Sequence, residues 1–209
     1  MTTPVQTAEV AVGDLPTLDA LDERHRPVFE ASVSEVQLRS KRWLVSQIDG
    51  LGWFDRSTVL VLGGWCGVLG WVLHRHGSGR PAAIVSVDLD IEASTVGHRV
   101  LAAPVPGLSF LCQDVLDLDY QRLAATRDLV VVNTICEHLP APAFQRWRAM
   151  LPEGLRVVLQ SNNYRGCPDH LNCVDSTEEL AATAALTDVA IADALDLGLF
   201  TRFMVAGWA

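Results

Sequence analysis

Short apolar runs alternate with longer segments of helical length from residue 58 to the end of the chain. The apolar runs occupy residues 58–62, 83–87, 108–112, 129–132, 155–159, 189–194 and 203–206. The longer segments occupy residues 67–76, 91–102, 142–151 and 177–186. Strands that are apolar on both faces and alternate with helices are typical of a parallel sheet covered on both sides. The pattern therefore predicts a doubly wound α/β fold, and the two closely spaced final runs predict an antiparallel last strand.

A helical period precedes these runs. Apolar residues recur at every third or fourth position up to Leu51, which predicts one long amphipathic helix from about Asp19. Residues up to about Leu15 are small and polar without a period, and we predict a disordered tail there. The chain is accordingly divided into residues 1–52, a tail with a helical lid or extension, and residues 53–209, the α/β domain.

Composition and charge limit the binding partners and the cellular compartment that we expect. An apolar content of 49% over 209 residues suits one compact domain. The net charge is −9 and no basic run occurs, which argues against nucleic acid. The first 16 residues lack the basic and apolar regions of a signal peptide, and no apolar stretch of about 18 residues occurs, so we expect a cytoplasmic protein without a membrane partner. The five cysteines are scattered and odd in number, which indicates reduced thiols.

A glycine-rich turn follows the first predicted strand. It contains Gly63, Gly64, Trp65 and Gly67, and Asp88 ends the second strand 21 residues after Gly67. Ligands of such sheets bind beyond the carboxyl ends of the strands, where an acidic side chain can accept bonds from ribose hydroxyls. The turn and the acid together predict an adenosine-containing cofactor. In the alternative interpretation, the glycines only make a tight turn and Asp88 caps the next helix.

The spacing of the turn argues against a dinucleotide. The G-x-G-x-x-G fingerprint is incomplete, and the bulky Trp65 opposes close contact with a diphosphate. Asp114 follows the third strand, where its carboxylate can accept a bond from an adenine amino group. An ordinary helix cap explains Asp114 equally well.

The chain from about Thr58 to its end resembles the class I S-adenosylmethionine-dependent methyltransferases. The motifs that carry the resemblance are, in order, VLVLGGWCG, IVSVD, FLCQD, DLVVVNTICEHLP and LRVVLQSNNY. The resemblance implies a Rossmann-like sheet of seven strands in the order 3-2-1-4-5-7-6, with the seventh strand antiparallel. It also implies S-adenosylmethionine as cofactor, bound by residues 53–209.

The resemblance assigns roles to the residues of the turn and of the strand ends. It implies that Gly63, Gly64 and Gly67 surround the amino acid part of the cofactor and that Asp88 binds the ribose. Asp114 and Val115 would flank the adenine, and Asn133 would line the mouth of the active site. Two residues depart from the family pattern: Val61 replaces a frequent acidic residue, and Trp65 replaces the middle glycine of the turn. The Trp65 ring either lies against the sulfonium, as a cation over an aromatic face, or packs in the core.

A polar loop after the fifth strand is the predicted wall for the substrate. It spans residues 160–164 and 167–173, where many amides and ring donors occur together. We interpret Asn163 and Tyr164 as groups that orient the substrate and His170 as a general base, because its ordinary pKa suits proton abstraction near neutral pH. In the alternative interpretation the loop satisfies its own polar groups.

Three further features each have a chemical and a plain interpretation. Residues 167–173 have the spacing C-x-x-H-x-x-C, which suggests zinc, but a fourth ligand is missing and we predict no metal. Glu137 and His138 either reach the reacting centre or cap a helix. Arg202 either pins a carboxylate or pairs with a surface acid, and we favour the latter.

Methyl transfer to a small molecule is the function that these features favour. Only the N-terminal helix and the loop after Tyr164 are available to hold an acceptor, which leaves little surface for a macromolecule. The main alternative is attack on the aminobutyrate chain of S-adenosylmethionine, which closes it into azetidine-2-carboxylate or a cyclopropane amino acid and releases methylthioadenosine. A third possibility is a non-catalytic sensor or interaction module. The sequence predicts no oligomeric state.

Overall fold

The computed structural model describes residues 18, 19 and 21–209 and contains a seven-stranded sheet. The strands are β1(Thr58–Leu62), β2(Ala83–Asp88), β3(Leu108–Cys112), β4(Leu129–Asn133), β5(Arg156–Asn162), β6(Thr187–Asp196) and β7(Thr201–Trp208). Their order is β3-β2-β1-β4-β5-β7-β6. The first five strands pair in parallel, and β7 runs antiparallel to both β5 and β6. The predicted fold class and strand order are confirmed.

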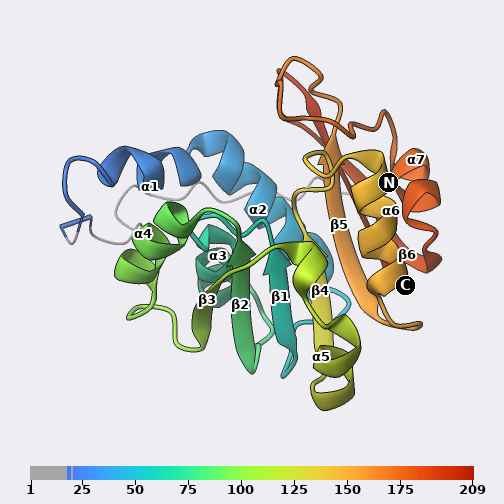
Figure 1. Ribbon diagram of the computed structural model, residues 1–209, viewed down its shortest axis with the longest axis horizontal. Helices are drawn as coiled ribbons and strands as arrows, with labels where there is room; N and C mark the ends of the chain where they lie inside the picture. The colour runs from blue at the N-terminus through green and yellow to red at the C-terminus, as the bar shows by residue number, and fades with distance from the viewer. Residues whose placement is uncertain (1–17, 20) are drawn as a thin grey trace.

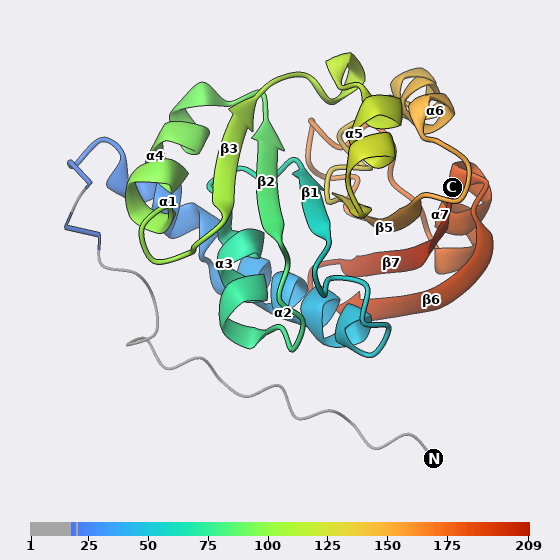
Figure 2. The same cartoon turned by 90° about the horizontal axis from the view of Figure 1, so that it is seen from below.

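Helices cover both faces of the sheet (Figures 1 and 2). One face carries α1(Arg26–Ser32), α2(Glu35–Asp49), α3(Val68–His76) and α4(Ile91–Leu101). The other carries α5(Tyr120–Thr126), α6(Ala141–Met150) and α7(Thr177–Ala184), with a 3₁₀ turn, η2(Val115–Asp117), after β3. Each layer encloses its own hydrophobic cluster, and the sheet separates the two. None of the described helices has both the length and the hydropathy to cross a bilayer.

The prediction of one long N-terminal helix is wrong. The helix is broken between α1 and α2, where Ser34 adopts an extended backbone with ψ 155°. Serine competes with helical hydrogen bonding through its own side chain, and Ser32 Oγ donates to the carbonyl of Phe29 at 2.6 Å. Sequence reasoning also missed the short helix α5, which Asp119 caps by accepting from Arg122 N.

Strand β5 continues past the apolar run that predicted it. The run ends at Leu159, whereas the strand extends through Gln160 and Ser161 to Asn162. Antiparallel pairing with β7, up to Asn162 opposite Arg202, satisfies the backbone of these polar residues. Polar side chains are therefore held on a rigid strand at the edge where ligands bind.

The helices that precede the sheet belong to the same hydrophobic layer as the strands. Leu44 and Ile48 of α2 are fully buried in one cluster with Val158 and Met204 of the sheet. Trp43 Nε1 also donates to Asp193 Oδ2 of β6 at 3.0 Å. This packing fixes α2 over the sheet. The disordered tail predicted up to about Leu15 lies outside the described residues.

Candidate active site

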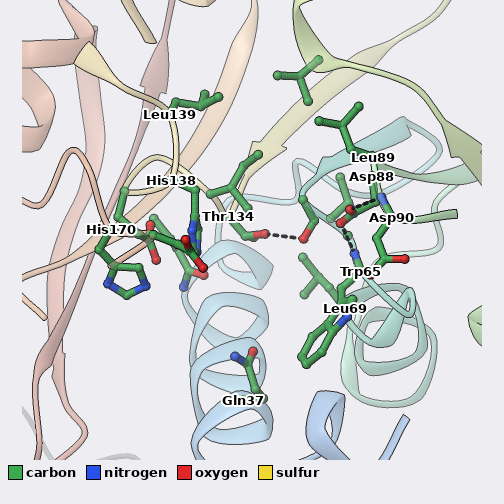
Figure 3. A pocket seen from close by; sticks show the side chains of 18 of the residues that line it. Gln37, Trp65, Leu69, Asp88, Leu89, Asp90, Thr134, His138, Leu139 and His170 are labelled. Atoms are coloured by element: carbon green, nitrogen blue, oxygen red, sulfur yellow. Dashed lines mark hydrogen bonds between the residues drawn. The ribbon is translucent and has the colours of Figure 1, made fainter. Parts of the chain in front are cut away.

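A cavity of about 930 Å³ opens at the carboxyl ends of the parallel strands. Its walls come from α2, the turn after β1, the ends of β2 and β3, the segment after β4 and the loop after β5. Figure 3 shows Asp88 and Trp65 on one side of the cavity, His138 and His170 on the opposite side, and Thr134 between them. This is the edge at which an open α/β sheet binds its ligands.

Backbone geometry explains the glycine-rich turn after β1. Gly63 has φ 66°, and a Cβ atom there would lie 1.9 Å from Cγ2 of Ile135. Trp65 also has a positive φ of 48°, which is rare for a side chain of this size. Its backbone N–H donates to Asp88 Oδ2 at 2.7 Å, so the acid at the end of β2 holds the turn in place. The half-buried Trp65 packs against the core and also lines the cavity.

Asp88 faces the cavity and does not cap the next helix. Its Oδ1 accepts from the backbone N–H of Asp90 at 3.0 Å. Asp90 is the residue that caps α4, by accepting from Ala93 N at 2.9 Å. A carboxylate oxygen has two lone pairs, so both oxygens of Asp88 can still accept from a ligand.

The predicted adenine-binding segment is rigidly supported. Asp114 Oδ1 accepts from Leu116 N at 2.8 Å and so caps η2, while Asp114 and Val115 both line the cavity. The carbonyl of Val115 accepts from Tyr120 Oη at 2.8 Å, and that hydroxyl accepts from Trp147 Nε1 at 3.0 Å. Burial raises the pKa of Tyr120, which keeps its hydroxyl protonated.

Most of the predicted cofactor residues lie around the cavity. Six line it, namely Gly63, Gly64, Trp65, Asp88, Asp114 and Val115. The seventh, Gly67, has φ 73° and starts α3 behind the turn, where a Cβ atom would lie 2.6 Å from the ring of Phe110. A side chain at Gly63 or at Gly67 would therefore collide with a neighbouring side chain.

The predicted catalytic residues divide into two pairs. Tyr164 and His170 line the cavity, whereas Asn133 and Asn163 are not among its lining residues. Asn133 is fully buried, and its Oδ1 accepts from the backbone N–H of Ile135 at 3.0 Å. Asn163 Oδ1 accepts from the backbone N–H of Thr201 at 2.9 Å. Contrary to expectation, Asn133 does not line the mouth of the site, because its side chain holds a loop behind the wall.

Ring contacts and one hydrogen bond position Tyr164 and His170. His170 Nδ1 lies 2.9 Å from the carbonyl oxygen of Tyr164. The Tyr164 ring stacks on Phe200, with 5.6 Å between ring centroids, and the His170 ring meets the edge of His138 at 4.7 Å. The loop backbone is held in turn by the carbonyl of Glu137, which accepts from Leu171 N and Asn172 N.

A buried ion pair lies at the β5 side of the cavity. Glu137 is 1% exposed, and its Oε1 accepts from Asn162 Nδ2 at 2.6 Å and from Arg202 Nη1 at 2.7 Å. The favoured expectation that Arg202 pairs with a surface acid is therefore wrong. Glu137 joins the segment after β4, the end of β5 and the start of β7, and it also lines the cavity.

Lys41 of α2 closes the same side of the cavity. It is the only lysine in the sequence, and its Nζ donates to Gln37 Oε1 one turn earlier. Burial and the nearby charge of Arg202 lower the pKa of Lys41 from 10.5 to about 7. Near neutral pH this amine is therefore divided between its charged and neutral forms.

The C-x-x-H-x-x-C segment does not gather its cysteines and histidine into one site within the described residues. Within the described residues, the group able to hold a metal is Glu137, His138 and His170, with ligand atoms within 4.8 Å of one another, and it includes neither Cys167 nor Cys173. Arg202 already binds Glu137, and its positive charge opposes a divalent cation there.

Several solved structures with this fold are methyltransferases by name. Magnesium protoporphyrin IX methyltransferase from Synechocystis PCC 6803, with bound SAH, matches over 86% of each chain with a TM-score of 0.60 at 12% identity. The N-methyltransferase NodS from Bradyrhizobium japonicum WM9 matches over 90% of this chain and 98% of its own, with a TM-score of 0.60 and 12% identity. The chain has the class I methyltransferase fold. No family model matches it.

One curated relative is also named as a methyltransferase. The chain is 30% identical over 135 residues to ribosomal RNA small subunit methyltransferase H from Chlorobium phaeobacteroides. The match covers 63% of this chain and only 38% of the relative. The similarity therefore spans well under half of that protein.

The sequence holds a weak signal for Lys41, which the sequence analysis did not name. Lys41 lies three residues after Leu38 and four before Val45, so it interrupts the apolar stripe of its helix. A lone charge in such a stripe faces the interior. Glu137 and Arg202 were both named from the sequence, but no local pattern indicates that they pair, because 65 residues separate them and only the fold brings them together.

Proposed function

We propose that this protein is an S-adenosylmethionine-dependent methyltransferase with a small-molecule acceptor. The observation that supports it most is the pairing of Asp88 with the turn at Trp65, since the carboxylate is presented to the cavity beside a glycine backbone that a Cβ atom at Gly63 would obstruct. Asp114 and Val115 lie on the same cavity, where they are expected to flank the adenine. These residues fit the three parts of the cofactor.

The second side of the cavity suits a small acceptor. Methyl transfer needs in-line alignment between the sulfonium and the acceptor atom more than it needs a strong acid or base. Tyr164, His170 and Glu137 surround the space that remains, and α2 covers it. The net charge of −9 disfavours an RNA acceptor such as the one named for the curated relative. Cyclisation of the aminobutyrate chain gains no support from the relatives, which are named as methyltransferases.

Calorimetry with S-adenosylhomocysteine tests the cofactor site. We expect Asp88→Ala to weaken binding by about 1–3 kcal/mol, the contribution of charge-assisted hydrogen bonds to the ribose. Asp117→Ala, at an exposed position two residues beyond Val115, is the matched control and should bind as the wild type does. No binding by the wild type would contradict the proposal.

Incubation with the labelled cofactor tests the reaction. With S-adenosylmethionine and a pool of cell metabolites, we expect enzyme-dependent S-adenosylhomocysteine by mass spectrometry. Methylthioadenosine formed without any acceptor would contradict methyl transfer. Label incorporated into ribosomal RNA rather than into metabolites would contradict a small-molecule acceptor.

A further inference from the structure

Four side chains outside the predicted cofactor residues line one part of the cavity. They are Lys41, Glu137, Gln160 and Arg202. Gln160 and Asn162 are two positions apart on β5, so their side chains face the same side of the sheet. Arg202 lies directly opposite Asn162 on β7. Helix α2 covers this side and brings Lys41 close enough for the charge of Arg202 to lower its pKa. Glu137 approaches from the segment after β4.

Three polar atoms in this cluster lack a hydrogen-bond partner within the described part of the chain. They are the donors Gln160 Nε2 and Arg202 Nε and the acceptor Glu137 Oε2. The side chains are deeply buried, with exposures of 2% for Gln160, 9% for Arg202 and 1% for Glu137, and all of them line the cavity. A buried polar group without a partner costs about 1–3 kcal/mol, so three together point to a ligand that satisfies them.

The charges of Lys41, Arg202 and Glu137 indicate which groups the ligand carries. Glu137 already neutralises Arg202, whereas no ion pair of Lys41 occurs among the described residues. An anionic group that enters here gains from Lys41 and from the unpaired donors of Gln160 and Arg202. Glu137 Oε2 lies in the same cluster and requires a donor, which an ammonium group supplies. A carboxylate with an adjacent ammonium meets both requirements, whereas a phosphate leaves Glu137 Oε2 facing an anion.

The β5 and β7 members of the cluster are set apart from the glycine-rich turn, whereas Lys41 lies near Cys66 of that turn. Strand β7 lies three places from β1 in the sheet, which corresponds to roughly 14 Å at the usual strand spacing. Asp88 and Trp65 also lie across the cavity from His138 and His170 (Figure 3). A molecule held at Arg202 therefore lies beside the cofactor residues and not among them.

We propose that Lys41, Gln160, Arg202 and Glu137 form the acceptor subsite and that the acceptor is an α-amino acid. Its carboxylate accepts from Lys41 Nζ, Gln160 Nε2 and Arg202 Nε, and its amino group donates to Glu137 Oε2. This inference rests on the proposed methyltransferase function, because it identifies the class of molecule that the cofactor would methylate.

Binding of amino acids to the protein saturated with S-adenosylhomocysteine tests the subsite. The probes are the proteinogenic L-amino acids, screened by saturation-transfer NMR and followed by calorimetry. We expect at least one amino acid to bind, and we expect its decarboxylated amine and its deaminated acid to bind at least tenfold more weakly. The variants Lys41→Met and Gln160→Met should each lose at least tenfold in affinity for the amino acid. Gln121→Met, exposed on α5 across the sheet, is the matched control and should bind as the wild type does.

The outcomes separate this inference from the proposed function. Lys41→Met and Gln160→Met remove polar groups without leaving a buried partner charge, so both proteins should fold, and circular dichroism checks this. If both variants bind S-adenosylhomocysteine tenfold more weakly than the wild type, the cluster serves the amino acid end of the cofactor and the inference is wrong. If no amino acid binds the loaded wild type, it is also wrong. If the wild type does not bind S-adenosylhomocysteine, the proposed function is wrong. The acceptor role proposed for the cluster is then wrong as well, because it depends on that function.

Discussion

The two sides of the cavity satisfy their polar groups in different ways. On the turn side, Asp88 and Asp114 accept backbone hydrogen bonds, three in all, and two of these come from residues only two positions away. On the β5 side, Glu137 is bound by the side chains of Asn162 and Arg202, 25 and 65 residues distant, and its second oxygen remains unpaired in the described structure. The acids on the turn side are held by backbone donors, whereas Glu137 on the β5 side is held by side chains and keeps one unpaired oxygen in the described structure.

The ion pair on the β5 side provides the largest expected effect. Glu137→Ala leaves Arg202 buried without its carboxylate, and we expect a loss of about 3–5 kcal/mol in the free energy of unfolding. Urea unfolding measures the loss. Asp175→Ala breaks the exposed pair with Arg165 and is the control, for which we expect no measurable change. Equal losses in the two variants would remove the distinction between a buried and a solvated pair.

Crowding on the turn side is tested by two glycines with positive φ. Gly63→Ala forces a Cβ atom against Ile135, and we expect a cost of about 2–4 kcal/mol together with weaker binding of S-adenosylhomocysteine. Gly154 has φ 76° and no atom within 4 Å of an added Cβ among the described residues, so Gly154→Ala isolates backbone strain at about 1 kcal/mol. Similar costs for the two would show that strain alone matters at the turn.

Lys41 gives the β5 side a dependence on pH. Its pKa is about 7 in the folded protein against 10.5 ordinarily, so the unfolded chain binds an extra proton between these values. The penalty on folding is largest below pH 7 and fades as the pH rises toward 10.5. Lys41→Met should therefore raise the free energy of unfolding by roughly 1–3 kcal/mol at pH 6, and the gain should shrink as the pH rises toward 10.5.

Urea unfolding of both proteins at several pH values measures this gain. Arg202 from β7 and Cys66 from the turn are the charged or titratable groups that act on Lys41 from other elements. Burial raises the pKa of Cys66 to about 11, so it is a neutral thiol near pH 7, where Lys41 titrates in the folded protein. A gain that is constant with pH would show that the amine titrates normally.

The loop after β5 should show the smallest effects. Tyr164 lines the cavity, so Tyr164→Phe should alter the KM for the acceptor while leaving the free energy of unfolding within about 0.5 kcal/mol. Asn163 Oδ1 instead accepts a hydrogen bond from the backbone N–H of Thr201. Asn163→Ala should therefore lower the free energy of unfolding by about 1 kcal/mol and leave kcat unchanged. Steady-state kinetics and urea unfolding separate the two, and a loss of kcat in Asn163→Ala would restore it as a candidate catalytic residue.

Much of the fold was predictable because its signals are local. The central strands β1 and β4 are buried along their whole length and read as apolar runs, since both of their faces are covered, and the turn from Gly63 to Gly67 follows directly from β1. The errors have two causes, one local and one tertiary. Ser34 divides a periodic segment into two helices, and pairing with β7 extends β5 over the polar residues from Gln160 to Asn162.

The sequence by itself determined the sheet, its order by resemblance, and the side of the cavity that is made from a turn and two strand ends. Backbone conformation and hydrogen bonds between near neighbours are encoded over a few residues, so the positions of Gly63, Asp88 and Asp114 at this edge of the sheet could be predicted without a structure. Only the tertiary structure decided that Glu137 meets Arg202 and that Lys41 faces the cavity. Those contacts depend on the packing of α2 and on the antiparallel return of β7, which join segments too distant in the chain for any local pattern to relate.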